Sequence, residues 1–157
     1  MEGGCTCGHV RYRLASKPLI VHACHCSWCQ RETGTAHALN ALYEADRVQH
    51  LKAEPELILT PSASGKGQTV ARCPNCKVAV WSNFPQAGPA VRFVRVGTMD
   101  NPGEYPPDIH IFTSSKLPWV TLPAGARVVA EFYSLDEVWS DEAKERRRIM
   151  RERATKK

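Results

Sequence analysis

Residues 73–76 read Cys-Pro-Asn-Cys, and residues 4–8 read Gly-Cys-Thr-Cys-Gly. The C-x₂-C spacing of the first stretch lets two thiolates converge on one ion, while Pro74 restricts the backbone. The second stretch is tighter, and its flanking glycines permit unusual backbone angles. Neither pair closes a tetrahedral site alone. Together they have the composition of a closed structural zinc site, which would tie the N-terminal segment to the middle of the chain and stabilise the fold. The four predicted ligands are Cys5, Cys7, Cys73 and Cys76.

Residues 24–29 read Cys-His-Cys-Ser-Trp-Cys and hold the remaining three of the seven cysteines. Three thiolates so close in sequence can occupy one face of a tetrahedral ion and leave its fourth position for water or substrate. Such an open position distinguishes catalytic zinc from structural zinc. We therefore expect two zinc ions: a structural one with four thiolates, and a more labile catalytic one held by Cys24, Cys26 and Cys29.

Other uses of the seven thiols remain open. The roles of the two sites could be exchanged, although the isolated pairs would then have to divide. All seven thiols could be structural, with His22, His25 or His110 as an eighth ligand. A redox role for Cys73 and Cys76 has less support because the chain shows no βαβ rhythm. A disulfide framework explains the clusters poorly, since the count is odd and no export signal is apparent.

The composition excludes several classes of protein. No apolar run approaches the ~20 residues that span a bilayer. The first residues show neither a basic nor an apolar signal region, so we expect a cytoplasmic protein. The net charge is +5, and residues 141–157 contribute eight Lys and Arg against four Asp and Glu. The rest of the chain is nearly neutral, so a globally basic surface for nucleic acid is not predicted.

Short apolar stretches between turn residues predict a mainly β domain of short antiparallel strands. Ser134 and Glu137 form a potential capping box, which predicts a C-terminal helix over about 135–150. We expect the β domain to cover residues 1–134, and the helix with its basic tail to cover 135–157. The predicted strands are 9–14, 18–23, 36–43, 56–60, 69–72, 78–81, 91–96, 110–113 and 127–132, with a single helical turn at 27–33.

The three cysteine clusters, in this order and spacing, resemble the glutathione-dependent formaldehyde-activating enzyme family, which includes the centromere protein V type domains. The resemblance covers roughly Gly3 to Phe132. Lys77 departs from the family pattern, because glycine usually follows the third cluster. The residues that carry the resemblance are Gly4-Cys5-x-Cys7-Gly8-x-Val10-Arg11-Tyr12, Cys24-His25-Cys26-Ser27-x-Cys29-Gln30-Arg31 and Cys73-x-x-Cys76, supported by Thr33-Gly34, Ser64-Gly65, His110-Ile111-Phe112 and Trp119.

The resemblance implies a tent-like zinc-binding β fold in which the first and third clusters hold the structural ion and the middle cluster holds the labile ion. It also implies an activity, the condensation of glutathione with formaldehyde to S-hydroxymethylglutathione, classed as a carbon–sulfur lyase. Glutathione carries two carboxylates, so basic side chains are expected near the catalytic zinc. Arg31 and Arg72 are the nearest in sequence, although each could instead balance the charge of the thiolates. Ser27 and Gln30 are further candidates for contact with substrate.

A non-catalytic function is the alternative. In that case the zinc sites would only stabilise the fold, and the basic tail with Arg146, Arg147 and Arg148 would contact a protein or nucleic acid.

Overall fold

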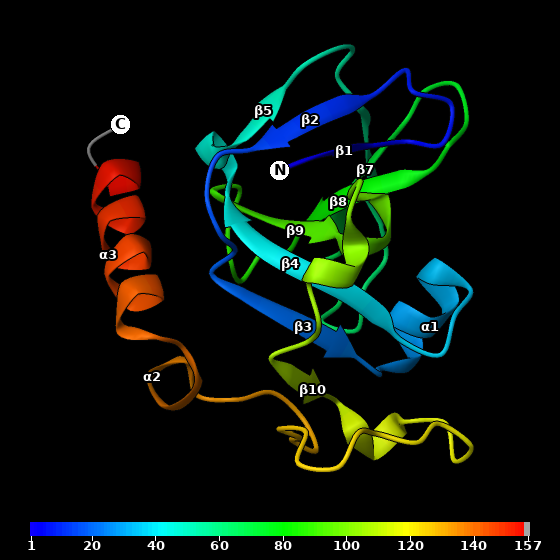
Figure 1. The fold of residues 1–157 in the computed structure, drawn as a ribbon, viewed down its shortest axis with the longest axis vertical. Helices are drawn as coiled ribbons and strands as arrows, with labels where there is room; N and C mark the ends of the chain where they lie inside the picture. The colour runs from blue at the N-terminus through cyan, green and yellow to red at the C-terminus, as the bar shows by residue number, and fades with distance from the viewer. Residues whose placement is uncertain (156–157) are drawn as a thin grey trace.

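The computed structural model describes residues 1–155 as two β-sheets with a helical C-terminal segment (Figure 1). The smaller sheet has the strand order β1-β2-β5, and the larger has the order β10-β3-β4-β9-β8-β7-β6. Neighbouring strands are antiparallel except β3 and β10, which are parallel. The prediction of a mainly β fold is therefore confirmed. The strands are β1 Glu2–Gly4, β2 Arg11–Leu14, β3 Ile20–Cys24, β4 Ala38–Glu44, β5 Val48–His50, β6 Glu56–Thr60, β7 Gln68–Arg72, β8 Ala79–Asn83, β9 Val91–Arg95 and β10 Ile109–Ile111.

Helices are few and mostly short. A helix of seven residues follows the middle cysteine cluster, as predicted, and the longest helix ends the described chain. No helix within residues 1–155 has both the length and the apolar character needed to cross a membrane. The α-helices are α1 Ser27–Thr33, α2 Leu135–Val138 and α3 Asp141–Thr155, and the 3₁₀ turns are Ala45–Arg47, Val96–Thr98, Pro102–Glu104 and Thr113–Ser115.

The smaller sheet covers one face of the larger sheet. Successive side chains of strand β4 point to opposite faces of the larger sheet. Ala41 and Tyr43 belong to the core between the two sheets, and Leu42 belongs to a second core on the opposite face. Tyr12 of β2 packs edge-on against Trp81 of β8, with ring centroids 5.9 Å apart. Both rings are almost fully buried, so this pair lies at the centre of the contact between the two sheets.

The C-terminal segment covers the other face. Trp139, which follows α2, is buried, and its indole N–H donates to the hydroxyl of Tyr133 at 2.8 Å. Burial lowers the pKa of His22 to about 4, so its neutral ring can accept the hydrogen bond of the same hydroxyl. This chain of buried polar groups joins the C-terminal segment to strand β3.

An ion pair fastens α3 to the end of β4. Arg146 donates to both carboxylate oxygens of Glu44, at 2.8 and 2.6 Å. The two side chains are 11% and 5% exposed, so solvent screens this pair weakly. Glu142, four residues before Arg146 on the same helix, also lies 3.7 Å from it but is exposed. The buried partner of Arg146 is therefore Glu44, which is distant in sequence, and not Glu142 on the same helix.

Two predictions about the C-terminal region were wrong. Residues 127–132 do not form a strand, because only Val128 makes a bridge, to His110 of β10. The predicted continuous helix is broken at Trp139, whose extended backbone lets its ring enter the core. The Ser134 side chain makes no capping hydrogen bond. Instead Ser140 caps α3, accepting from the Ala143 N–H at 3.2 Å.

The Glu44–Arg146 pair predicts a pH dependence of stability. Burial alone would raise the pKa of Glu44, but hydrogen bonds and charge attraction from Arg146 outweigh it and hold the pKa below its ordinary value of 4.5. A lowered pKa contributes stability that is complete above about pH 5 and is lost as pH falls through the folded-state pKa. Glu44→Gln should therefore cost about 2 kcal/mol in the free energy of unfolding at neutral pH. The difference from wild type should shrink as the pH falls below 4.5.

Urea titrations at a series of pH values measure this. Glu145→Gln is the matched control, since Glu145 pairs with Arg148 on the exposed face of α3 and should change little. A difference between wild type and Glu44→Gln that does not depend on pH would contradict this account.

Candidate metal centres

Four thiols from two distant turns meet in one place. The Sγ atoms of Cys5, Cys7, Cys73 and Cys76 all lie within 4.8 Å of one another. Cys7 Sγ lies 3.5 Å from Cys5 Sγ and 3.7 Å from Cys73 Sγ. Tetrahedral zinc with Zn–S bonds of about 2.3 Å requires sulfurs about 3.8 Å apart. The four side chains therefore fit a zinc ion, and their grouping agrees with the predicted four-thiolate site.

In both turns, the residue after the second cysteine has a left-handed backbone and donates its N–H to the carbonyl of the first cysteine. In the first, the Gly8 N–H donates to the Cys5 carbonyl at 3.0 Å, and Gly8 has φ of 72°. In the second, the Lys77 N–H donates to the Cys73 carbonyl at 2.9 Å, and Lys77 has φ of 60°. The left-handed region favours glycine because it has no Cβ. Lys77 thus takes up, at some cost in strain, a conformation that glycine adopts freely.

The three remaining thiols also converge. The Sγ atoms of Cys24, Cys26 and Cys29 lie within 4.8 Å of one another. Cys24 ends β3, Cys26 is the N-cap of α1, and Cys29 lies in the first turn of that helix. The Cys26 sulfur accepts a hydrogen bond from the Cys29 N–H at 3.3 Å. Hydrogen bonds from the other two thiols and from backbone N–H groups lower the pKa of Cys26, which favours its thiolate.

Within residues 1–155, no histidine or carboxylate joins the three-thiol group. The three histidines considered as an eighth ligand are engaged elsewhere. His25 Nε2 lies 3.0 Å from His110 Nδ1, and His22 is hydrogen-bonded to Tyr133. The ring of His25 also lies against that of His37, with centroids 4.9 Å apart. The geometry therefore favours three protein ligands over a closed four-ligand site.

A carboxylate that the sequence did not single out connects the two sites. Glu32 of α1 has a side chain only 7% exposed, and it accepts from two arginines. One is Arg72, next to Cys73, and the other is Arg95 of β9 at 2.7 Å. Arg95 also donates to Asn40 at 2.6 Å. The helix that carries Cys26 and Cys29 is thus fixed to the strand that leads into the four-thiol site.

The predicted substrate contacts differ in their surroundings. Arg31 is exposed and forms no ion pair among the described residues. Arg72 is already engaged, by Glu32 and by the Lys77 carbonyl at 3.1 Å. Gln30 uses its amide N–H groups on the carbonyls of His25 and Ser115, at 2.7 and 3.0 Å. Ser27, at the start of α1, is exposed.

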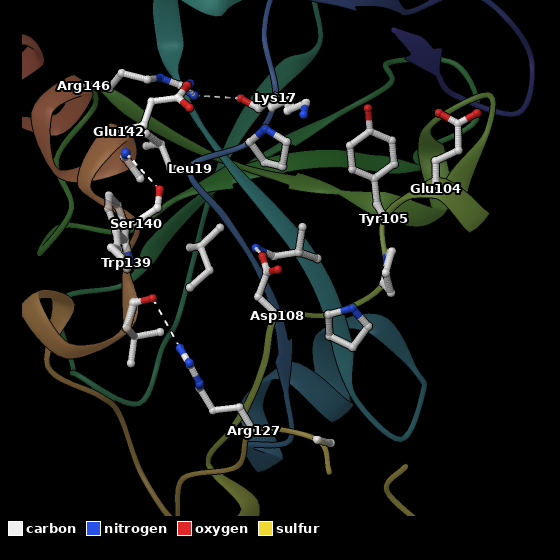
Figure 2. Close-up of a pocket in the computed structure, with 18 of the residues that line it drawn as sticks. Lys17, Leu19, Glu104, Tyr105, Asp108, Arg127, Trp139, Ser140, Glu142 and Arg146 are labelled. Carbon is white, nitrogen blue, oxygen red and sulfur yellow. Dashed lines mark hydrogen bonds and ion pairs between the residues drawn. The ribbon is translucent and has the colours of Figure 1, made fainter. Parts of the chain in front are cut away.

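A cavity of about 880 Å³ lies away from both thiol groups (Figure 2). It is bounded by the beginning of β3, by residues 104–108 and by the C-terminal helices. Lys17, Asp108 and Arg127 place both signs of charge around it, while Leu19 and Trp139 supply apolar surface. None of the seven cysteines lines this cavity, so we do not assign the thiol chemistry to it, although it is large.

Comparisons with known proteins find similarity to a family model, to a curated protein and to a solved structure. A family model described as glutathione-dependent formaldehyde-activating enzyme matches residues 1–115. A Halomonas elongata protein, named provisionally as a glutathione-dependent formaldehyde-activating enzyme, is 29% identical over 127 residues, which are 78% of this chain and 80% of that protein. The crystal structure of a Rhodobacter sphaeroides protein aligns with 64% of this chain and 88% of its own, at 20% identity and a TM-score of 0.49.

The two thiol groups predict two bound zinc ions that differ in how fast they are released. The purified protein should release zinc to a mild chelator in two phases, with the three-thiol site first, because an open coordination position admits the chelator. Cys7 is exposed, but an ion beside it would still have four protein bonds. A colorimetric zinc indicator, followed over time, measures both amounts. Release of all the metal in one phase, or a single ion per chain, would contradict the assignment.

The same assignment predicts unequal effects on stability. Cys73 is fully buried, and Cys73→Ser should lower the melting temperature by more than about 15 °C, because binding energy at a structural site is folding energy. Cys26 is half-buried at a helix end, and Cys26→Ser should lower it by less than about 5 °C. Thermal melts followed by circular dichroism compare them. Equal losses would show that the roles of the two sites are not as assigned.

Proposed function

Because this chain belongs to the glutathione-dependent formaldehyde-activating enzyme family, we propose that it catalyses the reversible addition of a glutathione-like thiol to a small aldehyde. The single observation that carries the proposal is the convergence of Cys24, Cys26 and Cys29 without a fourth protein ligand among the described residues. The family match covers residues 1–115 and so includes all seven cysteines. This is the carbon–sulfur lyase activity that the motifs imply.

The reaction forms one bond between sulfur and the carbonyl carbon and breaks the π bond of the carbonyl group. The thiol proton is transferred to the carbonyl oxygen, which becomes the hydroxyl of the adduct. The thiol must lose its proton before it attacks, because the thiolate is the nucleophile. A zinc ion held by three thiolates would supply a Lewis acid that lowers the pKa of an added thiol or polarises the aldehyde oxygen.

Side chains of this protein would hold that ion and orient the substrate. Cys24, Cys26 and Cys29 would be its ligands, and the hydrogen bond from the Cys29 N–H to the Cys26 sulfur orients one of them. The amide of Gln30 fixes the start of α1 to the carbonyls of His25 and Ser115. This contact supports a positioning role for Gln30. Ser27 is exposed beside the cluster and stays a candidate for substrate contact.

The two arginines are proposed to have different roles. Arg31 lies two residues beyond Cys29, and its exposed guanidinium forms no ion pair with any residue that the structure describes, so it can bind a carboxylate of the thiol substrate. Arg72 already has a buried carboxylate partner, which supports the alternative that it balances local charge and holds α1 in place. A substrate role for Arg72 would require it to leave Glu32.

The alternative of a binding module has less support. Of the three arginines proposed to contact a partner, Arg146 is occupied by Glu44, and Arg148 pairs with Glu145 and Glu152. Two of these three arginines are therefore engaged by carboxylates of the same chain, which leaves fewer free cations for phosphate than the sequence alone implies.

The proposed activity predicts faster exchange between free glutathione and its formaldehyde adduct. Magnetisation-transfer NMR measures this exchange directly, and the zinc-loaded protein should raise its rate above the uncatalysed rate. Cys26→Ser should remove at least about 90% of the increase, because one ligand of the catalytic ion is lost. Zinc-stripped protein is the control for the spontaneous reaction. No increase over that control would refute the proposed substrate pair.

A further inference from the structure

The free edge of the larger sheet carries apolar side chains that the fold leaves uncovered. Strand β6 is the last strand of this sheet, and β7 is its only neighbour among the described residues. Leu57 and Leu59 are 63% and 75% exposed. Both leucines lie on one face of the strand, two residues apart.

That face is a continuation of the core between the two sheets. Leu57 pairs with Ala71 of β7, and Ala71 pairs with Trp81 of β8. Ala71 and Trp81 are buried in the core under the smaller sheet. The apolar face of the larger sheet thus continues onto β6, which the smaller sheet does not cover.

The strand lacks the devices that usually protect a sheet edge. Edges are commonly blunted by charged side chains, bulges or proline within the strand. The one charged residue of β6 is Glu56, and it is paired with Lys77 at 3.3 Å. The only irregularity nearby is in the β7–β8 pairing, between Ala71 and Arg72, and not at the edge itself.

The sequence of the edge is symmetrical about its centre. Residues 55–61 read Pro-Glu-Leu-Ile-Leu-Thr-Pro, with a proline three positions to either side of Ile58. A two-fold axis through Ile58 would place Leu57 opposite Leu59 of the second copy, and Glu56 opposite Thr60 of the second copy. No like charges would then face each other, and the four leucines would form one cluster. The prolines, which lack an N–H, would limit the ladder to the five residues of β6.

We propose that a second copy of this chain binds along β6, so that two larger sheets join antiparallel about a two-fold axis through Ile58. The association stops at two copies, because the other end of the sheet, β10, is already bonded by residues 127–131. A five-residue strand spans about 17 Å and cannot bury the ~1,600 Å² of a standard interface. The dimer is therefore weak, with a dissociation constant of about 10–100 µM.

Analytical ultracentrifugation of the zinc-loaded full chain tests this proposal. The wild-type protein should be monomeric near 1 µM and approach twice the monomer mass near 500 µM, as mass action requires at about the expected affinity. Leu57→Glu alone and Leu59→Lys alone should each remain monomeric at the higher concentration. An equimolar mixture of the L57E chain and the L59K chain should dimerise again, because the register places the two new charges opposite each other.

Two controls make the outcome specific. Unchanged melting temperatures would show that the variants are folded, as expected for side chains this exposed. Trp119→Lys makes the same kind of change at a residue that is 71% exposed elsewhere, and it should leave the association intact. A wild-type protein that stays monomeric, or that forms particles larger than dimers, overturns the proposal. So does a dimer that survives both single variants, or a mixture that does not recover.

Discussion

Two turns that lie 66 residues apart bring four sulfur atoms together at one end of the core. Cys5 and Cys73 are themselves buried members of that core, so the sulfurs belong to the packing of the two sheets and not to an appendage. Thiolates gathered this closely would repel one another without a cation. The binding energy of a structural zinc site, about 10–16 kcal/mol, is as large as the whole stability of a typical domain. The smaller sheet, whose strand β1 ends next to Cys5, would depend most directly on an ion held there.

The three-thiol group is also attached to the larger sheet, through the ion pairs of Glu32. Its helix, α1, has no fully buried side chain and packs weakly by itself. Glu32 compensates, because its carboxylate is bound by arginines from β7 and β9 and so anchors the helix to the larger sheet. Cys24 meanwhile belongs to the second core, on the opposite face from the four-thiol group. One sheet therefore carries the four-thiol group on one face and the three-thiol group on the other, and it fixes their separation.

The sequence predicted what local patterns encode. Cysteine spacing predicted which thiols converge, and alternation with turn residues predicted most strands of the larger sheet. It missed β1 and β5, which are three residues long and carry too little pattern to recognise. It also missed the break at Trp139, where burial of one indole ring outweighs helix propensity. The contacts of Glu32 and Glu44 were not predictable, because nothing local marks a carboxylate whose partners lie on other strands.

The division of the thiols into four and three is the central claim, and zinc X-ray absorption spectroscopy measures it without reference to activity. The fully loaded protein should show on average about 3.5 sulfur ligands per zinc at about 2.3 Å, with the remainder a light atom. After brief chelation the average should rise to about four sulfurs, since only the closed site would keep its ion. An average that stays constant or falls after chelation would contradict the account, as would a short zinc–zinc distance showing that the thiols bridge two ions.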